Sequence, residues 1–344
     1  MAKIVIVGGG LAGLTLARQF QAVGVDFHVL EARGRLGGRI KGLNDSGHSF
    51  DLGPSWYWPG QPRMARLAKD LNIATFDQHA SGDLMYETDQ GDVQRGVGFA
   101  SMEGSFRLDG GMTALIDGLA SSLPLDCITL NAAAVRVEQS FGVTLSDGRI
   151  FPAEHIVLAC SPRVAASLEF SPDIPKDALK SIPTWMGGQA KFVATYDAPF
   201  WRTMGLSGDA VSRLGPLVEI HDASPQNASL GALFGFVGVP HDVRIDQPDA
   251  VIAAALNQLA RLFGQAARIP RQAHLEDWAT QPETADDQDK TPLMSHPEYG
   301  LSSALEDLWN GTLHFGSTEA AKDFGGFLEG ALVRAETLAK RILK

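Results

Sequence analysis

The sequence predicts an α/β protein of two domains, a Rossmann-like domain and an α+β domain built on an antiparallel sheet. Three observations predict it: a strand–glycine–helix pattern at the N-terminus, a second glycine–helix pattern at the C-terminus, and alternating apolar runs between them. With 344 residues the chain is long enough for about two cores. We expect a discontinuous first domain of residues 1–75, 106–162 and 276–344, and a second domain of residues 76–105 and 163–275.

The N-terminal pattern begins with the apolar, β-branched run IVIV at residues 4–7, which is typical of a buried strand. It continues into GGGLAG at residues 8–13 and a helix that Gly24 ends. The first glycine allows a tight turn, the second lets a pyrophosphate approach, and the third lets the helix pack on the strand. The helix start offers free N–H groups and a positive dipole to phosphates. The residues expected to contact a dinucleotide here are Gly8, Gly10, Leu11, Ala12 and Gly13.

A carboxylate follows the second apolar run. Glu31 lies about 20 residues beyond the glycine turn, where an acidic side chain accepts hydrogen bonds from the adenosine ribose. A lone GxGxxG motif is weak, but here strand, glycines, helix, second strand and acid occur in order. This order favours dinucleotide binding over a chance glycine turn.

The next segment, RGRLGGR at residues 33–39, distinguishes a flavin from a nicotinamide dinucleotide. Paired glycines between arginines form a loop whose backbone can lie against a ligand while guanidinium groups meet phosphate oxygens. Nicotinamide enzymes do not need such a loop, so the segment indicates FAD. The residues expected to contact it are Ala32, Arg33, Gly37, Gly38 and Arg39.

Residues 30–39 resemble the LEAxxRxGGR signature of the flavin-containing amine oxidase superfamily, which includes monoamine and polyamine oxidases. Residues 51–59 resemble its DxGGxxxGP segment, with Pro54 in place of the second glycine, and residues 311–331 resemble its FAGTET…GYMEGA segment. The resemblance implies that the last helix points its N-terminus at the flavin, where a positive dipole stabilises the reduced ring. It implies further FAD contacts at Gly53, Pro54, Ser55, Trp56, Ala134, Val135, Trp278, Ser317, Thr318, Glu319, Gly326, Phe327 and Leu328.

The resemblance also implies three residues for catalysis. Lys191, ahead of PFW at residues 199–201, matches the family lysine that holds a water against flavin N5, although a strand lysine is ordinarily solvated. Trp56 either lines a substrate pocket or fills core. Phe327 matches one ring of the aromatic pair that guides amines in monoamine oxidases, without its hydroxyl. The other ring should follow Trp278, where the chain has only Gln288 and acidic neighbours, so an aromatic cage is not expected.

The composition of the chain limits the kinds of binding partner that we expect. Lys and Arg number 29 against 40 Asp and Glu, and the net charge of −11 argues against nucleic-acid or anionic-membrane surfaces. We see no export signal and no run of about 18 apolar residues, so a cytoplasmic protein off the membrane is expected. Histidines lack metal spacing, and Cys127 and Cys160 form neither a disulfide framework nor the family's covalent flavin link. We therefore expect noncovalent FAD and no metal; the sequence does not indicate the number of subunits.

Between the two ends, residues 132–140, 141–145 and 150–158 predict a three-stranded meander. Residues 189–196, 211–221 and 230–237 predict the antiparallel strands of the second domain, followed by a helix over 248–263. Acidic residues within 283–289 indicate a solvated loop. Between a hairpin at 83–99 and the GGM motif at 110–112, the family's long helical stretch over the active site is almost absent. A wide substrate pocket is therefore expected.

These features predict an FAD-dependent oxidoreductase of the amine oxidase type, which transfers a hydride from a small-molecule substrate to flavin N5 and uses O₂ as reoxidant. Two alternatives remain open at this point. One is a renalase-like NAD(P)H oxidoreductase or a flavin desaturase, since the chain is compact. The other is an FAD-binding protein without turnover.

Overall fold

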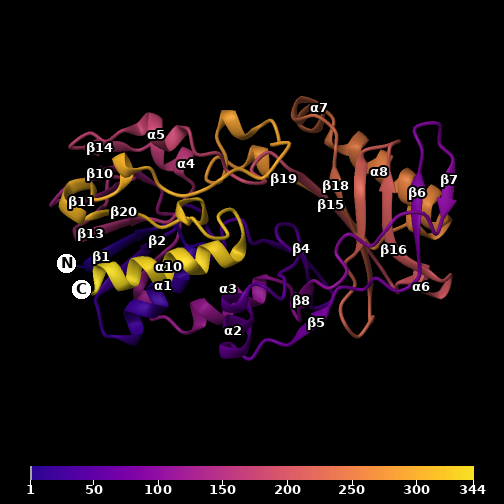
Figure 1. Cartoon of the computed structure of the whole chain (residues 1–344), viewed down its shortest axis with the longest axis horizontal. Helices are drawn as coiled ribbons and strands as arrows, with labels where there is room; N and C mark the ends of the chain where they lie inside the picture. Colours follow the sequence, from indigo (N-terminus) through magenta and orange to yellow (C-terminus); the bar gives the residue numbers. More distant parts are fainter. Residues whose placement is uncertain (1) are drawn as a thin grey trace.

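The computed structural model describes residues 2–344, and a parallel five-stranded sheet organises one half of it (Figure 1). The strand order is β20-β13-β1-β2-β9, and all neighbouring strands run parallel. The bounds are β1 Ala2–Val7, β2 Phe27–Leu30, β9 Ile128–Thr129, β13 Ala153–Leu158 and β20 Leu313–Phe315. Because β1 and β20 belong to one sheet, the segments predicted to bind the cofactor at both chain ends lie in one unit.

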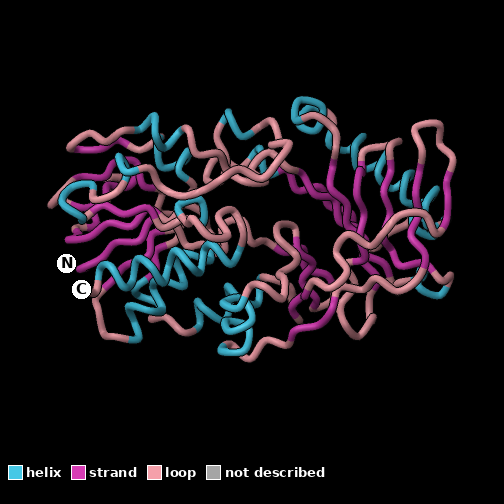
Figure 2. Tube along the Cα trace, in the orientation of Figure 1, coloured by secondary structure: helices cyan, strands magenta, loops and turns pink. Residues whose placement is uncertain are grey.

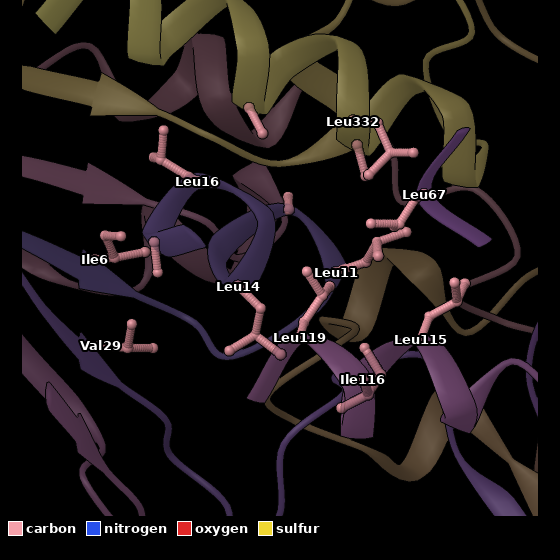
Figure 3. Close-up of a cluster of buried hydrophobic side chains, with 14 of the residues drawn as sticks. Ile6, Leu11, Leu14, Leu16, Val29, Leu67, Leu115, Ile116, Leu119 and Leu332 are labelled. Atoms are coloured by element: carbon pink, nitrogen blue, oxygen red, sulfur yellow. The ribbon is translucent and has the colours of Figure 1, made fainter. Parts of the chain in front are cut away.

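Layers cover both faces of this sheet, as the period of two in β1 requires. Ile4 and Ile6 pack into a cluster with the helices, and Figure 3 shows this cluster extending from Ile6 and Leu16 to Leu332 on α10. Val5 and Val7 pack toward a four-stranded sheet of order β12-β11-β10-β14. These covering elements are α1 Leu11–Ala22, α2 Pro62–Asp70, α3 Thr113–Ser121, α10 Leu328–Ile342, β10 Ala134–Glu138, β11 Gly142–Leu145, β12 Ile150–Phe151 and β14 Glu169–Ser171.

The predicted third strand of the meander, residues 150–158, is wrong. The run divides at Pro152 into β12, which pairs with β11, and β13, which pairs with β1 in the parallel sheet. Proline carries no N–H and so cannot donate to a strand ladder, which makes it a natural dividing point. One apolar run thus serves two sheets.

The other half contains a seven-stranded sheet of order β19-β15-β18-β17-β16-β6-β7 (Figure 2). It is antiparallel except for the pair β16 and β6, and helix α8 packs on one face. The predicted strand over residues 211–221 is wrong, because the chain turns at Gly215 and forms β16 and β17. The bounds are β6 Asp83–Glu87, β7 Val93–Arg95, β15 Ala190–Tyr196, β16 Leu206–Ser212, β17 Leu217–Asp222, β18 Gly231–Val237, β19 Gln272–Asp277 and α8 Pro248–Phe263.

The face of this sheet opposite α8 meets the first domain. Phe50 and Leu52, from a hairpin that follows the glycine loops, cluster with Val193 and Phe234 on it. Residues on this face are therefore the ones that the sheet can present to a cofactor. The remaining elements are β3 Gly42–Asp45, β4 His48–Asp51, β5 Thr75–Asp77, β8 Phe106–Leu108, α4 Pro162–Ala166, α5 Lys176–Lys180, α6 Phe200–Thr203, α7 His241–Asp246, α9 Leu308–Gly311 and short 3-10 turns.

The expected α/β class, with a parallel sheet and a second, mainly antiparallel sheet, is confirmed. The predicted domain limits stay a prediction, and the one at residue 276 falls inside β19. Over residues 2–344, no helix is both long and apolar enough to cross a membrane.

Candidate active site

Of the three motif glycines in the turn after β1, two are crowded by backbone and one is open. A Cβ on Gly8, whose φ is +117°, would lie 3.0 Å from the Ala159 backbone, and one on Gly13 would lie 2.1 Å from the Gly8 carbonyl oxygen. A Cβ on Gly10 would meet nothing nearer than 3.8 Å. Helix α1 begins here at Leu11 without a side-chain cap, so its first-turn N–H groups can serve a ligand.

Glu31 lies directly after β2 and is buried. Its carboxylate accepts hydrogen bonds from the N–H groups of Gly9 at 2.8 Å and Arg33 at 2.9 Å. A carboxylate has about four acceptor positions, so capacity remains for the predicted ribose hydroxyls. Glu31 therefore both fixes the glycine turn and can bind a ligand.

The arginines of the second glycine loop are engaged mainly with protein. Arg35 donates to the carbonyl oxygens of Leu36, Gly38 and Ile40, which closes the loop. Arg33, just after Ala32, pairs with Glu283 at 3.1 Å. Arg39 pairs with Glu319 at 2.6 Å and joins this loop to the C-terminal segment. The expected contact between these guanidinium groups and phosphate stays a prediction.

The Gly37-Gly38 turn of this loop contacts the first glycine turn, and the residues before β10 contact Glu31. Gly37 and Gly38 have φ values of +107° and +57°, and Gly37 N–H donates to the Gly9 carbonyl. The N–H of Ala132 donates to the Glu31 carbonyl at 2.8 Å. Ala134 and Val135 follow two residues later, so the structure places them near the predicted adenosine end.

The C-terminal segment after β20 supplies one orphaned polar atom. The Ser317 hydroxyl is buried, and no hydrogen-bond partner is found for it among residues 2–344. The Thr318 hydroxyl donates to the Phe327 carbonyl at 2.7 Å, and Glu319 is fully buried against Arg39. Buried polar groups are ordinarily satisfied, so Ser317 points to a missing polar partner.

Helix α10 begins at Leu328, and no side chain caps its N-terminus. The chain reaches it through Gly326, at a φ of +81°, and Phe327. An uncapped helix N-terminus carries positive potential that suits an anionic ring. The N-termini of α1 and α10 and the orphaned Ser317 hydroxyl can all donate hydrogen bonds, and Gly10 leaves space for a ligand beside them. This set of groups fits the diphosphate, polyol and ring of FAD.

Gly53 lies in a crowded turn after β4. A Cβ there would lie 2.0 Å from the Arg39 carbonyl oxygen and 3.4 Å from the ring of Trp278. The Trp278 ring nitrogen donates to the Leu52 carbonyl at 3.0 Å, and the side chain is buried. Trp278 thus supports the turn that carries Pro54 and Ser55.

Lys191, near the start of β15, points its ammonium at this turn. Nζ lies 3.0 Å from the Gly53 carbonyl oxygen, 2.6 Å from Ser55 Oγ, and 3.8 Å from the ring centroid of Phe234. The residue is only 3% exposed. The solvated strand lysine that residue type alone would favour is therefore not what the structure contains.

Two buried charges surround Lys191. Burial lowers the pKa of its ammonium to about 7, with Asp51 opposing this change and Arg107 adding to it. Burial raises the pKa of Asp51, which Lys191 and Arg107 oppose. Asp51 also accepts from the Met112 N–H at 2.8 Å, so it is held at a fixed distance from the site.

Trp56 is half-buried and belongs to an aromatic group on the sheet face. Its ring centroid lies 5.1 Å from those of His221 and Phe234, and its ring nitrogen donates to Gln78 at 2.8 Å. His221 is buried between Asp209 at 2.9 Å and Glu219 at 3.1 Å. Sequence reasoning missed His221 and Phe234. Alternation along β17 and β18 assigns these side chains to a face of the sheet, but this was usable only once β18 was known to pair with both β15 and β17.

Phe327, 40% exposed, has a neighbour that sequence reasoning missed. The His296 ring stacks on it, with a centroid distance of 4.8 Å and an interplanar angle of 16°. Trp185 and Tyr299 pack edge-on against His296. Gln288, where the second ring of the aromatic pair was looked for beyond Trp278, is exposed and donates to Asp286. No spacing in the sequence identified His296.

Comparisons with known proteins agree with this architecture. The family model described as flavin containing amine oxidoreductase matches residues 11–98 and 92–343, in two parts that meet at 92–98. A probable flavin-containing monoamine oxidase A of Dictyostelium discoideum is 24% identical over 448 aligned positions, covering 98% of this chain and 97% of that protein. The alignment is longer than the chain, so the relative has segments that this chain lacks.

Human amine oxidase [flavin-containing] B is 42% identical over 74 residues, covering 21% of this chain and 14% of that protein. Among solved structures, cyclohexylamine oxidase from Brevibacterium oxydans has a TM-score of 0.82 at 20% identity, covering 99% of this chain and 98% of that one. Putrescine oxidase bound to putrescine has a TM-score of 0.81 at 19% identity, covering 99% of both chains. The chain therefore belongs to the flavin containing amine oxidoreductase family and is an FAD-dependent oxidoreductase.

Proposed function

We propose that this protein oxidises small-molecule amines, with O₂ as the final electron acceptor. The observation that carries the proposal is the buried ammonium of Lys191 beside the Gly53–Ser55 turn, at the junction of the two sheets. FAD, when bound, supplies the hydride acceptor and returns the electrons to O₂. Relatives whose names describe oxidation of monoamines, putrescine or cyclohexylamine support an amine as substrate.

The chain's own residues position a water molecule and stabilise the charge that develops during the reaction. An ammonium has three donors, and two of those on Lys191 are used by Gly53 and Ser55. The third can hold a water, the role that the family resemblance assigns to this lysine. A fixed positive charge there favours the negative charge that develops during flavin reduction, as does the N-terminus of α10.

We further propose that FAD is held without a covalent bond. Burial raises the pKa of the Cys160 thiol to about 12, which keeps it unreactive, and its backbone N–H lies near the glycine turn. Acid precipitation should therefore release all yellow colour into the supernatant as FAD. Flavin that stays in the pellet would show that the attachment is covalent.

An anaerobic screen of the purified holoprotein against amines, amino acids and NAD(P)H tests the proposed reaction. We expect amines to bleach the flavin, and O₂ to restore its colour with release of peroxide. Bleaching by NAD(P)H alone would replace amine oxidation with a nicotinamide oxidoreductase activity. If no donor bleached the flavin, the proposed amine oxidation would also be refuted.

A further inference from the structure

Four aromatic rings surround the entry to helix α10, and their contacts join separate segments of the chain. The His296 ring stacks on Phe327 with a centroid distance of 4.8 Å, and Trp185 packs edge-on against His296 at 4.9 Å. Tyr299 packs against the same imidazole at 5.5 Å. A Cβ on Gly326 would meet Trp185, Tyr299 and His296 within 3.2 Å. The four side chains therefore form one contiguous group, here called the ring group.

The chain connects the ring group to both parts of the proposed reaction centre. Trp185 lies six residues before Lys191, on the segment that leads into β15. Phe327 directly precedes α10, whose N-terminus is expected to face the flavin ring. His296 and Phe327 are both exposed. The ring group thus presents an open surface at the expected ring end of the cofactor site.

One nitrogen of the His296 ring is fixed by the backbone. Nε2 lies 2.9 Å from the Gly325 carbonyl oxygen. A carbonyl oxygen only accepts hydrogen bonds, so Nε2 carries the proton and donates it. In the neutral ring, Nδ1 then holds a free lone pair that points away from this carbonyl. No hydrogen-bond partner for Nδ1 is found among residues 2–344, so His296 offers an unused acceptor on an exposed surface.

Two other basic groups near the reaction centre are not free in this way. The ring nitrogens of His221 face two carboxylates, at 2.9 and 3.1 Å, and the ring is buried. Lys191 is buried too, and its ammonium donates to the Gly53–Ser55 turn. A proton taken up by either group has no direct path to water. The exposed ring of His296 can pass a proton to solvent.

The titratable groups around His296 leave its ring free to exchange a proton. Burial raises the pKa of the Tyr299 phenol, so this neighbour stays neutral, and its hydroxyl donates to the Pro183 carbonyl at 2.9 Å. Two ion pairs near Tyr299 are neutralised internally: Arg39 with Glu319, and Arg163 with Asp289. The other charged groups on the adjoining segments are exposed to water and salt, which screen them: Glu298, Lys322 and Asp323.

The proposed reaction needs an acceptor for a proton. A primary amine reaches the protein mainly as an ammonium ion, because such groups have an ordinary pKa of about 10. An ammonium has no lone pair, so a hydride cannot leave the neighbouring carbon until the nitrogen loses a proton. The ring of Phe327 can attract the cation through its π system, beside the free nitrogen of His296.

We propose that His296 is a catalytic base whose Nδ1 takes a proton from the ammonium of the bound amine. The inference rests on the proposed amine oxidation and adds a residue to it. One N–H bond of the ammonium breaks and an Nδ1–H bond forms, which leaves the lone pair on the amine nitrogen. The imidazolium then releases this proton to water, and the hydride leaves the substrate carbon only after the amine is neutral.

The variant His296→Phe tests this role, because a phenyl ring keeps the stack on Phe327 and removes both nitrogens. Anaerobic stopped flow measures the second-order rate of flavin reduction by an amine that bleaches the wild type. At about pH 7 this rate should fall on the order of 10²-fold, the usual contribution of a general base. At about pH 10 the solution itself supplies neutral amine, so the two proteins should agree within about threefold.

His48→Phe is the matched control. It removes an imidazole on β4 that bonds to Ser229 at 2.9 Å, and it should react as wild type at both pH values. A histidine that only supports the ring of Phe327 predicts a different pattern for His296→Phe. An equal loss at both pH values, or no loss at either, would overturn the assignment.

A binding measurement with tert-butylamine separates this proposal from the proposed reaction. This amine has no hydrogen on the carbon beside nitrogen and cannot be oxidised, so flavin absorbance of the holoprotein follows its binding alone. A pH indicator measures proton release at about pH 8, where an ordinary imidazolium gives its proton to water. The wild type should release about one proton for each amine bound, and His296→Phe should release about none.

The two measurements together give distinct outcomes. If tert-butylamine releases a proton from the wild type alone while no amine bleaches the flavin, the base stands and amine oxidation falls. If amines are oxidised but neither the proton release nor the pH-dependent loss distinguishes the two proteins, the base is overturned and the reaction stands. If neither proton release nor bleaching occurs, both are overturned.

Discussion

The cofactor end and the substrate face of this protein are built by different means. At the cofactor end the shape comes from backbone: glycines at 8, 10, 13 and 37 leave the chain close to itself and open to a ligand. On the substrate face it comes from side chains that strand register brings together, such as Lys191, Phe234 and His221. The first kind of site depends on local sequence and the second on pairing between distant strands.

This difference predicts that substitutions have unlike consequences. A side chain added at a glycine of the cofactor end meets backbone that cannot move away, so binding and fold fail together. A side chain removed from the substrate face changes rates or specificity and leaves the cofactor bound. The predictions below test this contrast, beginning with the largest expected effect.

Gly13→Val should give protein that retains no FAD. The added Cβ would lie 2.1 Å from the Gly8 carbonyl oxygen, and such overpacking costs about 1–3 kcal/mol or more. FAD titration and thermal unfolding measure the loss. Gly60→Ala, at a position with no atom within 4 Å of the new Cβ, is the control and should behave as wild type. A Gly13→Val protein with normal FAD content would show that the helix does not pack on the strand as described.

Glu31→Ala should weaken FAD binding by roughly ten- to a hundredfold, because a hydrogen bond to a charged group contributes about 1.5–3 kcal/mol. The variant also leaves the N–H groups of Gly9 and Arg33 without their acceptor, so stability should fall too. Glu31→Gln keeps one acceptor oxygen and should lose less. Unchanged FAD affinity in Glu31→Ala would contradict the placement of the ribose.

Ser317→Ala should have a smaller effect with opposite signs in the two forms of the protein. Its hydroxyl is buried without a partner, so removing it should leave the apoprotein equally or more stable. If the hydroxyl binds the cofactor, FAD affinity should fall about two- to tenfold. Chemical denaturation of the apoprotein and FAD titration measure the two values. An unchanged affinity would place Ser317 outside the cofactor site.

The same contrast explains how far the sequence could be interpreted. The GGGLAG turn, Glu31 and the C-terminal glycine segment could be placed because each motif specifies its own local backbone. The single strand predicted over residues 150–158 was wrong because Pro152 divides it between two sheets. The alternation of apolar and polar residues does not reveal this division. The expected solvated acidic loop was wrong for Asp289, which is buried against Arg163 and accepts from the Thr184 N–H. His296 could not be found, because its partner Phe327 lies on a different segment and only the fold joins them.

The most direct test of the account is flavin reduction in Lys191→Met, since the proposed reaction centre depends on this side chain. Methionine keeps much of the stem and removes the charge, so FAD should stay bound. Stopped-flow measurement of reduction and reoxidation, with any donor that bleaches the wild type, should show a loss on the order of 10²-fold. Lys180→Met, at a half-exposed lysine on α5, should react as wild type. If both rates in Lys191→Met stayed within about twofold of wild type, Lys191 would not lie at the reaction centre.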